Sequence, residues 1–217
     1  MAEFAAGAGH EMNNPLAVIS GRAQLLLRGE TDPQRRADLA LIKAQATRVH
    51  EMTADLMLFA RPPAPVKCDV DLVQLVRSTV DKLRDAANEK RSQLVAKLPD
   101  VPVPAHVDEA QITVVVRALV ENALNAVGDR GRVTVELDSL ENQVRLIVRD
   151  NGPGIAPEER GLIFDPYYSG RQAGRGLGMG LPKCWRFIQL HGGQLTVQEA
   201  AGGGAEFVVT LPTADSP

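Results

Sequence analysis

A cluster of prolines divides this chain of 217 residues and constrains its fold more than any other feature. Three of the four residues at 62–65 are prolines, which lack a backbone N–H donor, so the helical pattern before them must end there. From residue 66 onward the pattern changes to alternating strands and helices. We therefore predict two domains, residues 1–61 and 67–217, joined by a stiff linker of residues 62–66.

The first domain is predicted to be a pair of antiparallel helices. Gly29 supplies a stop signal, and Asp32 followed by Pro33 supplies the cap and first turn of a second helix. In the first helix the apolar residues recur every three or four positions, at Phe4, Ala8, Met12, Leu16, Ile19, Ala23 and Leu26. In the second they form a nearly unbroken heptad seam, at Leu39, Ile42, Ala46, Val49, Thr53, Leu56 and then Phe59 or Ala60.

Such a hairpin has too little apolar surface to offset the entropy of ordering its about 55 residues. Two copies packed as a four-helix bundle would bury both seams. We therefore predict a homodimer built on residues 1–61. The alternative is a helix pair that folds back on its own second domain.

The second domain is predicted to be an α/β sandwich, with a mixed sheet and helices on one face. Asp108 and Gln111 form a capping box that opens its longest helix. The expected strands cover residues 93–97, 105–107, 132–137, 144–149, 194–199 and 205–211, and the expected helices cover residues 71–87, 108–127 and 181–191. The whole chain is thus expected to be an α+β multidomain protein, an N-terminal antiparallel helical hairpin followed by this sandwich.

The composition excludes several classes of protein. With 44% hydrophobic and 24% charged residues the chain is typical of a soluble globular protein, and no stretch is long and apolar enough to span a membrane. A net charge of -3 gives no reason to expect nucleic acid as a partner. Cys68 and Cys184 lie far apart and are read as thiols in a reducing compartment. We expect a cytoplasmic location, with membrane attachment only through an upstream segment absent from this sequence.

His10 is the candidate reactive residue of the first helix. With Asn14, Ala17 and Gly21 it forms a row of polar or small residues, which leaves the imidazole open to a large partner. A neutral imidazole can attack an electrophile through its free ring nitrogen, and Glu11 could hold the proton of the other nitrogen. The alternative is a surface histidine without a chemical role. A zinc protease is excluded, because Asn14 stands where the second histidine of that motif is required.

Three further stretches carry polar or glycine residues in patterns that suit a ligand. Asn122 and Asn125 share one helical face, so their amide oxygens could ligate a hard cation such as Mg²⁺ together with phosphate oxygens; capping or surface asparagines are the alternative. The carboxylate of Asp150 ends a strand beside two glycines and could accept from an exocyclic amine, although the stretch could also be an ordinary turn. Residues 174–181 alternate glycine with other residues before a helix start, which suits phosphates.

The order of these motifs is specific. It reads His10-Glu11-x-x-Asn14-Pro15, Asn122-x-x-Asn125, Asp150-x-Gly152-x-Gly154, Phe164-Asp165-Pro166 and Gly176-x-Gly178-x-Gly180. Over essentially its whole length the chain resembles the sensor histidine kinases of two-component systems, and the five stretches resemble that family's H, N, G1, F and G2 boxes. The resemblance implies a dimerisation and phosphotransfer hairpin followed by an ATP-binding domain of the gyrase, Hsp90, kinase and MutL type.

The resemblance also implies residue roles. His10 would be the phosphoacceptor, Glu11 its general base, and Asn14 a residue that orients water toward the phosphoaspartate of a response regulator. Asn122 would bind Mg²⁺, and Asp150 would read adenine. The remaining residues that would frame ATP and its lid are Asn125, Gly152, Gly154, Ile155, Gly176, Leu177, Gly178, Met179, Gly180 and Leu181.

The implied function is ATP-dependent autophosphorylation of His10 and phosphotransfer to a receiver-domain aspartate, with phosphatase activity toward that regulator. The rival is an ATPase that uses nucleotide-driven conformational change without histidine phosphorylation. Such ATPases need a glutamate four residues before Asn122, where this chain has Ala118. Sensor kinases often have asparagine at that position, and threonine where this chain has Leu177. We expect ATP binding to be retained, and these two departures leave its affinity open.

Overall fold

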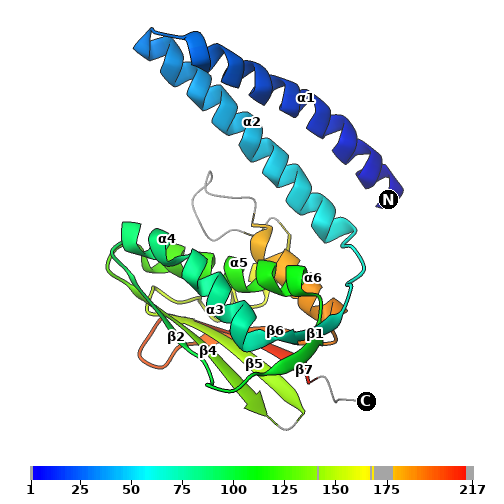
Figure 1. The fold of residues 1–217 in the computed structure, drawn as a ribbon, viewed down its shortest axis with the longest axis vertical. Helices are drawn as coiled ribbons and strands as arrows, with labels where there is room; N and C mark the ends of the chain where they lie inside the picture. Colours follow the sequence, from blue (N-terminus) through cyan, green and yellow to red (C-terminus); the bar gives the residue numbers. More distant parts are fainter. Residues whose placement is uncertain (1, 141, 167, 169–177, 214–217) are drawn as a thin grey trace.

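The computed structural model describes residues 2–140, 142–166, 168 and 178–213, with side chains from Asn14 onward except that of Ala60. Its two parts are a long helical hairpin and an α/β domain (Figure 1). Among the described residues, no helix combines the length and the hydropathy that crossing a bilayer requires.

The hairpin consists of two helices, α1 (Ala2–Gly29) and α2 (Pro33–Ala60). The predicted turn between them is confirmed. Asp32 is the N-cap of α2, its side chain accepts a hydrogen bond of 2.9 Å from the backbone N–H of Arg35, and Pro33 begins the helix. The guanidinium Nη1 of Arg36 donates to the carbonyl oxygen of Leu27 at 3.1 Å, which ties the start of α2 to the end of α1. The short connection forces the two helices to run antiparallel.

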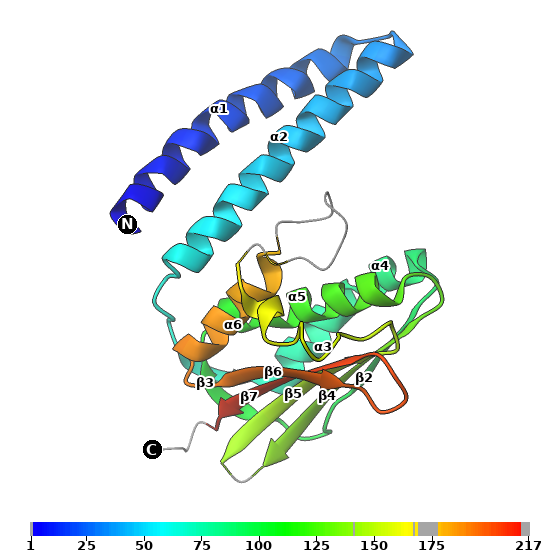
Figure 2. The same cartoon turned by 180° about the vertical axis from the view of Figure 1, so that it is seen from behind.

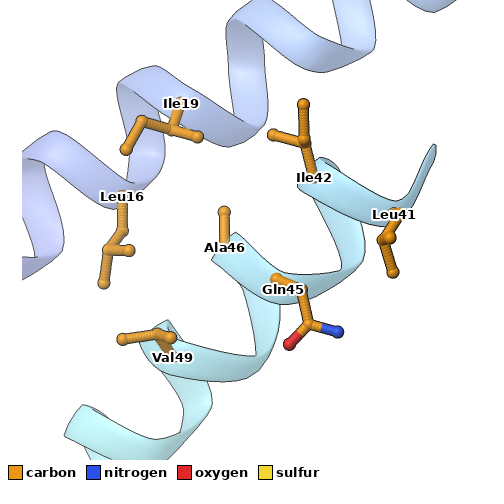
Figure 3. A pocket seen from close by; sticks show the side chains of 7 residues that line it. All are labelled: Leu16, Ile19, Leu41, Ile42, Gln45, Ala46 and Val49. Carbon is orange, nitrogen blue, oxygen red and sulfur yellow. The ribbon is translucent and has the colours of Figure 1, made fainter. Parts of the chain in front are cut away.

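The apolar seam of the hairpin is only partly covered. Ala23 and Ala46 are buried where the two helices meet, because small side chains let the backbones approach closely. Larger members of the seam stay in water, with exposed fractions of 46% for Ile19, 60% for Leu26 and 48% for Ile42. An apolar groove opens between the helices (Figure 3), lined by Leu16, Ile19, Leu41, Ile42, Gln45, Ala46 and Val49.

The second domain is built on a five-stranded mixed sheet in the order β2-β4-β5-β7-β6, in which β2 is parallel to β4 and the other neighbours are antiparallel (Figure 2). Its strands are β2 (Gln93–Lys97), β4 (Arg132–Leu140), β5 (Gln143–Asp150), β6 (Gln194–Glu199) and β7 (Ala205–Pro212). A separate antiparallel pair consists of β1 (Cys68–Asp71) and β3 (Pro104–Val107). The helices are α3 (Leu72–Lys82), α4 (Arg84–Glu89), α5 (Glu109–Val127), α6 (Gly180–Leu190) and the 3₁₀ helix η1 (Leu162–Phe164). The predicted fold class is confirmed.

The core of this domain lies between the sheet and α5, which packs across β4 and β5. Val115, Leu119 and Ala123 recur every four residues on one face of α5 and are fully buried. Val135 and Val148, paired across β4 and β5, are fully buried beneath the helices. The position of α5 is therefore fixed by close packing along its length, so the side chains on its rim have well-defined places.

Two local expectations differ from the structure. The single helix predicted over residues 71–87 is two helices, because the backbone N–H of Leu83 bonds to the carbonyl of Val80, a 3₁₀-type contact that ends α3. The short strand β1 was not predicted. It has only four residues, and both Cys68 and Asp69 are exposed, so it lacks an alternating apolar pattern.

The linker is tied to the start of α5 at two points. The amide Nε2 of Gln111 donates to the carbonyl of Pro63 at 3.0 Å, and the backbone N–H of Val66 donates to Asp108 Oδ2 at 2.8 Å. The predicted capping box is only half formed: Asp108 Oδ1 accepts from the N–H of Gln111, but the Gln111 side chain reaches the linker instead of the cap. The Asp108 N–H, which the Gln111 side chain would bond in a full capping box, instead donates to Nε2 of His191. Burial raises the pKa of Asp108, but these backbone hydrogen bonds outweigh it, and the net pKa is lowered.

A row of ion pairs crosses the sheet. Glu136 Oε1 lies 2.7 Å from Nζ of Lys97 and 3.3 Å from Nη1 of Arg149. The second guanidinium nitrogen of Arg149, Nη2, lies 2.5 Å from Oε2 of Glu206. The hydrogen bond from Lys97 lowers the pKa of Glu136 more than burial raises it, and the charge of Arg149 adds to this effect. The ionised form of Glu136 is therefore favoured by folding.

This row of ion pairs predicts a pH-dependent contribution to stability. Because the folded-state pKa of Glu136 is lowered, its contribution is present above the unfolded-state pKa of about 4.3 and is lost as pH falls through the folded-state value. We expect Glu136→Gln to reduce the free energy of unfolding by about 1 kcal/mol at pH 7, with the difference shrinking as pH falls below about 4.3. Urea unfolding over a series of pH values measures this. Glu89→Gln, at an exposed position of α4, is the control, and a loss that does not shrink with falling pH would show that packing is responsible instead.

Candidate active site

Asp150 is the centre of the candidate site. It is the last residue of β5 and is only 3% exposed. Its Oδ1 accepts hydrogen bonds from the backbone N–H groups of Gly152 at 2.8 Å and Ala205 at 3.2 Å. Its Oδ2 is buried and has no hydrogen-bond partner among the described residues. A buried acceptor without a partner is costly, so this oxygen suits a donor brought by a ligand.

The electrostatics of Asp150 support this reading. Burial raises the pKa of its carboxyl group, and the two backbone hydrogen bonds only partly offset that effect. A donor group that bonds to Oδ2 would stabilise the ionised form, so a ligand with an amine or amide N–H gains a charge-assisted hydrogen bond there.

Three glycines surround Asp150, because a side chain at these positions would collide with neighbouring backbone or carboxylate atoms. A Cβ atom on Gly204 would lie 2.0 Å from the carbonyl oxygen of Asp150, and Gly204 has a φ of +94°. Gly154 has a φ of +76°, and a Cβ there would lie 3.2 Å from the carbonyl oxygen of Gly204. At Gly152 a Cβ would lie 2.9 Å from Asp150 Oδ1 and 3.2 Å from the carbonyl oxygen of Ala126. The backbone segments at 152–154 and 204 can therefore pack closely against one another and against the end of β5.

The loop that follows Gly154 is held in place by side chains. The guanidinium Nε of Arg160 donates to the carbonyl oxygen of Ile155 at 3.1 Å. Ile155 and Phe164 are half-buried and pack against the core. The hydroxyl of Tyr168 donates to Glu159 at 2.7 Å. Ile155, predicted from the sequence to contact the cofactor, thus lies on a fixed loop beside the Asp150 site.

The C-terminal part of α5 borders the same site, because Gly152 lies against the backbone of Ala126. Asn122 is half-buried one helical turn before Ala126. Its amide oxygen is a suitable ligand for a hard cation. Among the described residues, no three His, Cys, Asp or Glu side chains come together to hold a metal ion.

Asn125 is exposed, and its amide oxygen is already engaged. Nζ of Lys90 donates to Asn125 Oδ1 at 2.5 Å and to the carbonyl oxygen of Leu124 at 3.1 Å. Asn125 can therefore offer its amide N–H groups to a ligand, and these suit phosphate or hydroxyl oxygens. The sequence predicted that both amide oxygens share one helical face for a cation, whereas in the structure the oxygen of Asn125 accepts from Lys90.

The start of α6 is the other described segment that carries predicted nucleotide-binding residues. Gly178 has a φ of +67°, Met179 is the N-cap residue and is buried, and Gly180 begins the helix. None of the described side chains caps this helix, and the N–H groups at a helix start suit an anion. Leu181 is half-buried and packs against the core. Two predicted members of this stretch, Gly176 and Leu177, lie outside the described residues.

His10, Glu11 and Asn14 belong to the other part of the molecule. His10 and Glu11 lie within helix α1, and Asn14, one turn later, is exposed. In Figures 1 and 2, the C-terminal end of α2 lies between the N-terminal part of α1 and the second domain. The structure therefore brings Gly152, Gly154 and the end of α5 to Asp150 and places His10 on a separate element.

Comparison with known families agrees with this division. Residues 107–215 match the family of histidine kinase-, DNA gyrase B- and HSP90-like ATPases, and residues 1–65 match the His Kinase A (phospho-acceptor) domain. The chain belongs to the histidine kinases. Its second domain is thus of the ATP-binding type, and its hairpin is of the phosphoacceptor type.

Individual histidine kinases resemble the chain along nearly all of its length. The signal transduction histidine-protein kinase AtoS of Escherichia coli (strain K12) is 29% identical over 213 residues, which are 98% of this chain and 35% of AtoS. The structure of full-length ShkA in complex with AMPPNP superposes with a TM-score of 0.88 at 24% identity, over 100% of this chain and 47% of ShkA. The histidine kinase ThkA, in complex with the response regulator protein TrrA, gives a TM-score of 0.72 at 21% identity, over 98% of this chain and 61% of that chain. The chain thus spans about a third of AtoS and about half of ShkA.

Two residues of the candidate site were missed by sequence reasoning. Gly204 shapes the wall beside Asp150, and Ala205 donates its backbone N–H to that carboxylate. The run of three glycines at 202–204 was the available signal, since all three have positive φ values. It lies more than 50 residues after Asp150, and only the pairing of β7 with β5 brings them together.

The geometry of Asp150 predicts opposite effects of one substitution on stability and on binding. In Asp150→Asn the amide oxygen can keep both backbone hydrogen bonds while the buried charge is removed, so we expect the melting temperature without ligand not to fall. Loss of the charged acceptor, worth about 1.5–3 kcal/mol, should weaken ATP binding by about 10- to 100-fold. Thermal unfolding with and without ATP measures both effects, with Asp129→Asn in an exposed turn as control. An ATP-induced shift equal to that of the wild type would show that adenine is read elsewhere.

Proposed function

We propose that this chain is the catalytic core of a histidine kinase that binds Mg·ATP, transfers the γ-phosphoryl group to His10, and passes it to an aspartate of a response regulator. The observation that carries the proposal is the buried Oδ2 of Asp150, which has no partner among the described residues and lies in a carboxylate surrounded by closely packed glycine backbone. The proposed domains are residues 1–61 and 67–217, with 62–66 as the linker.

In this proposal, ATP is held by three elements. Asp150 accepts a hydrogen bond from the exocyclic amine of adenine, and Gly152 and Gly154 let the backbone lie against the ring. The uncapped start of α6 receives the phosphates, together with the N–H groups of Asn125. The ShkA structure, which holds the ATP analogue AMPPNP, supports a nucleotide in a fold of this kind.

The amide oxygen of Asn122 is the proposed protein ligand of Mg²⁺. Its half-buried position beside the Asp150 cradle suits this role, and the phosphate oxygens complete the ligand set. When bound, the ion supplies positive charge that neutralises the phosphates.

The proposed chemistry on α1 consists of two transfers. A ring nitrogen of His10 attacks the γ-phosphorus, an N–P bond forms, the bond to the bridging oxygen breaks, and ADP leaves. Glu11 accepts the proton of the other ring nitrogen. A carboxylate oxygen of the response regulator then attacks the same phosphorus, and the imidazole leaves. Positioning of the reactants supplies most of the rate.

A response regulator is the proposed partner, and the ThkA complex with TrrA supports a docking of this kind. Asn14 is exposed one turn after His10, so it lies where a docked partner can reach it. Its neutral amide can hold a water molecule near a phosphoaspartate without repelling the phosphoryl charge, which is the proposed basis of phosphatase activity. At Ala118 a methyl group packs against the core and cannot activate water, so transfer is favoured over ATP hydrolysis.

The central test is phosphorylation of His10. We expect the chain to take label from γ-labelled ATP in an acid-labile, base-stable form. His10→Gln should abolish the label and leave ATP affinity unchanged, because the acceptor and the nucleotide lie on different elements. His50→Gln, at an exposed histidine of α2, is the matched control and should be labelled like the wild type. Acid-stable label, or label in His10→Gln, would rule out this acceptor.

We also propose that two copies of the hairpin form a four-helix bundle. The groove of Figure 3 leaves Ile19, Leu41 and Ile42 facing water, although a lone chain rarely exposes so continuous an apolar surface. The seam of a second hairpin has the same apolar character and can fill this groove. The match of residues 1–65 to the phospho-acceptor domain supports this arrangement.

The bundle predicts that Ile42→Glu weakens the dimer. The substitution forces a charge into the shared seam of each copy, so we expect the dimer dissociation constant to rise at least about tenfold. Analytical ultracentrifugation of the full chain over a concentration series measures this. Ala44→Glu, on the exposed side of the same helix, is the control and should dimerise normally. A wild type that remains monomeric at high concentration would exclude the bundle.

A further inference from the structure

A lysine that belongs to none of the predicted motifs holds a residue of the candidate site. Lys90 follows α4, and its Nζ donates to Oδ1 of Asn125 at 2.5 Å and to the carbonyl oxygen of Leu124 at 3.1 Å. Both acceptors belong to the last turn of α5, 35 and 34 residues further along the chain. The last carbonyls of a helix have no partner within the helix, and a cation is favoured there. Lys90 therefore completes the end of α5 and holds Asn125 with the same ammonium group.

The position of Lys90 is fixed by the backbone around it. Its carbonyl oxygen accepts from the N–H of Arg130 at 3.0 Å, in the turn that follows α5. Two residues later, the hydroxyl of Ser92 donates to the carbonyl oxygen of Gly128 at 3.0 Å and accepts from the N–H of Gly131 at 3.1 Å. The segment that carries Lys90 is therefore attached to both sides of that turn, so its ammonium group reaches Asn125 from a defined point.

The contact with Lys90 fixes which way the amide of Asn125 faces. An ammonium group has donors and no acceptor, so the amide atom that meets it has to be the oxygen. The NH₂ group, on the other branch of the planar amide, is then turned away from Lys90. Without Lys90 the two branches could exchange by rotation, because Asn125 is exposed. An amide turned the other way would present an oxygen to a ligand, and an oxygen repels phosphate oxygens where two N–H donors would bind them.

Asn125 borders the candidate site. It lies directly before Ala126, whose backbone carbonyl would be 3.2 Å from a Cβ atom on Gly152. It also lies three residues after Asn122, on the same helical face. In the proposed function the base of ATP lies at Asp150 and its metal ion at Asn122, so the phosphates extend along this end of α5. A donor at Asn125 suits a phosphate oxygen there, and an acceptor does not.

We propose that Lys90 is a positioning residue for ATP: it holds the amide oxygen of Asn125 and so turns the amide N–H groups toward the phosphates. This inference rests on the proposed binding of ATP at Asp150 and adds a residue to it. Lys90 acts through Asn125, so it needs no contact of its own with the nucleotide. Its effect is confined to the phosphate part of the ligand, because the adenine is held at Asp150, whose carboxylate is bonded to Gly152 and Ala205.

The test is a double-variant cycle on the full chain, in which calorimetry measures the affinity for AMPPNP with Mg²⁺ and NMR titration measures the affinity for adenosine. We expect Lys90→Met to bind AMPPNP about three- to tenfold more weakly, as for the loss of one hydrogen bond, with unchanged adenosine affinity. Adding Lys90→Met to Asn125→Ala should cause no further loss, because Lys90 acts through that amide. Lys90→Arg keeps a cationic donor and should bind AMPPNP nearly as well as the wild type. Lys82→Met, which removes an exposed lysine from the last turn of α3, is the matched control.

The role of Lys90 is overturned if Lys90→Met binds AMPPNP like the wild type, if it loses AMPPNP and adenosine affinity equally, or if the losses add in the double variant. Asn125→Asp guards against a folding defect at Lys90, because it keeps the contact with Lys90 as an ion pair but has no amide N–H to offer. It should lose AMPPNP affinity at least as strongly as Lys90→Met and keep adenosine affinity, and wild-type AMPPNP affinity in this variant contradicts the proposal. None of these measurements needs phosphorylation. A wild type that binds AMPPNP but takes no label from γ-labelled ATP overturns the kinase function, and the same affinities still decide the role of Lys90.

Discussion

The buried carboxylate of Asp150 is the constraint on which most of the second domain depends. Its Oδ1 needs donors, and it obtains them from the backbone at Gly152 and at Ala205, two segments more than 50 residues apart. Both donors can approach only because the chain has no side chain at 152 and 204. The pairing of β5 with β7 therefore supports one local arrangement, in which the second carboxylate oxygen has no partner among the described residues.

An arrangement of this kind exchanges stability for binding. An unpaired buried oxygen destabilises the folded domain by an amount comparable with a whole hydrogen bond. The close packing around Val115, Leu119 and Phe207, all fully buried, offsets that penalty elsewhere in the domain. Functional sites commonly depart from the rule that buried polar groups are paired, and the departure marks where the ligand is needed.

Local signals in the sequence predicted most helices and strands, whereas the contacts between residues distant in sequence could not be predicted. The Asp32–Pro33 helix start and the strands over 93–97 and 194–199 follow from cap chemistry and alternation, which are properties of neighbouring residues. The break at Leu83 has no glycine or proline to announce it. Nor does any motif show that Lys90 takes the amide oxygen of Asn125, because the two are joined only by the fold.

The same limit applies to the junction between the two parts. The capping pattern at Asp108 and Gln111 was read from the sequence as a helix signal, and the structure uses half of it for the linker. His191 could replace the Gln111 side chain at the cap because its other ring nitrogen bonds to the carbonyl of Phe187, which leaves Nε2 as an acceptor. The start of α5 thus also holds the linker that leads from the hairpin.

The Asp55–Lys183 pair is a contact between α2 and α6, and its side chains are 34% and 13% exposed. Ion pairs near the surface are worth about 0.2–1 kcal/mol, which changes a population by a few-fold. A contact of this strength restrains the second domain against the hairpin but does not by itself fix it there.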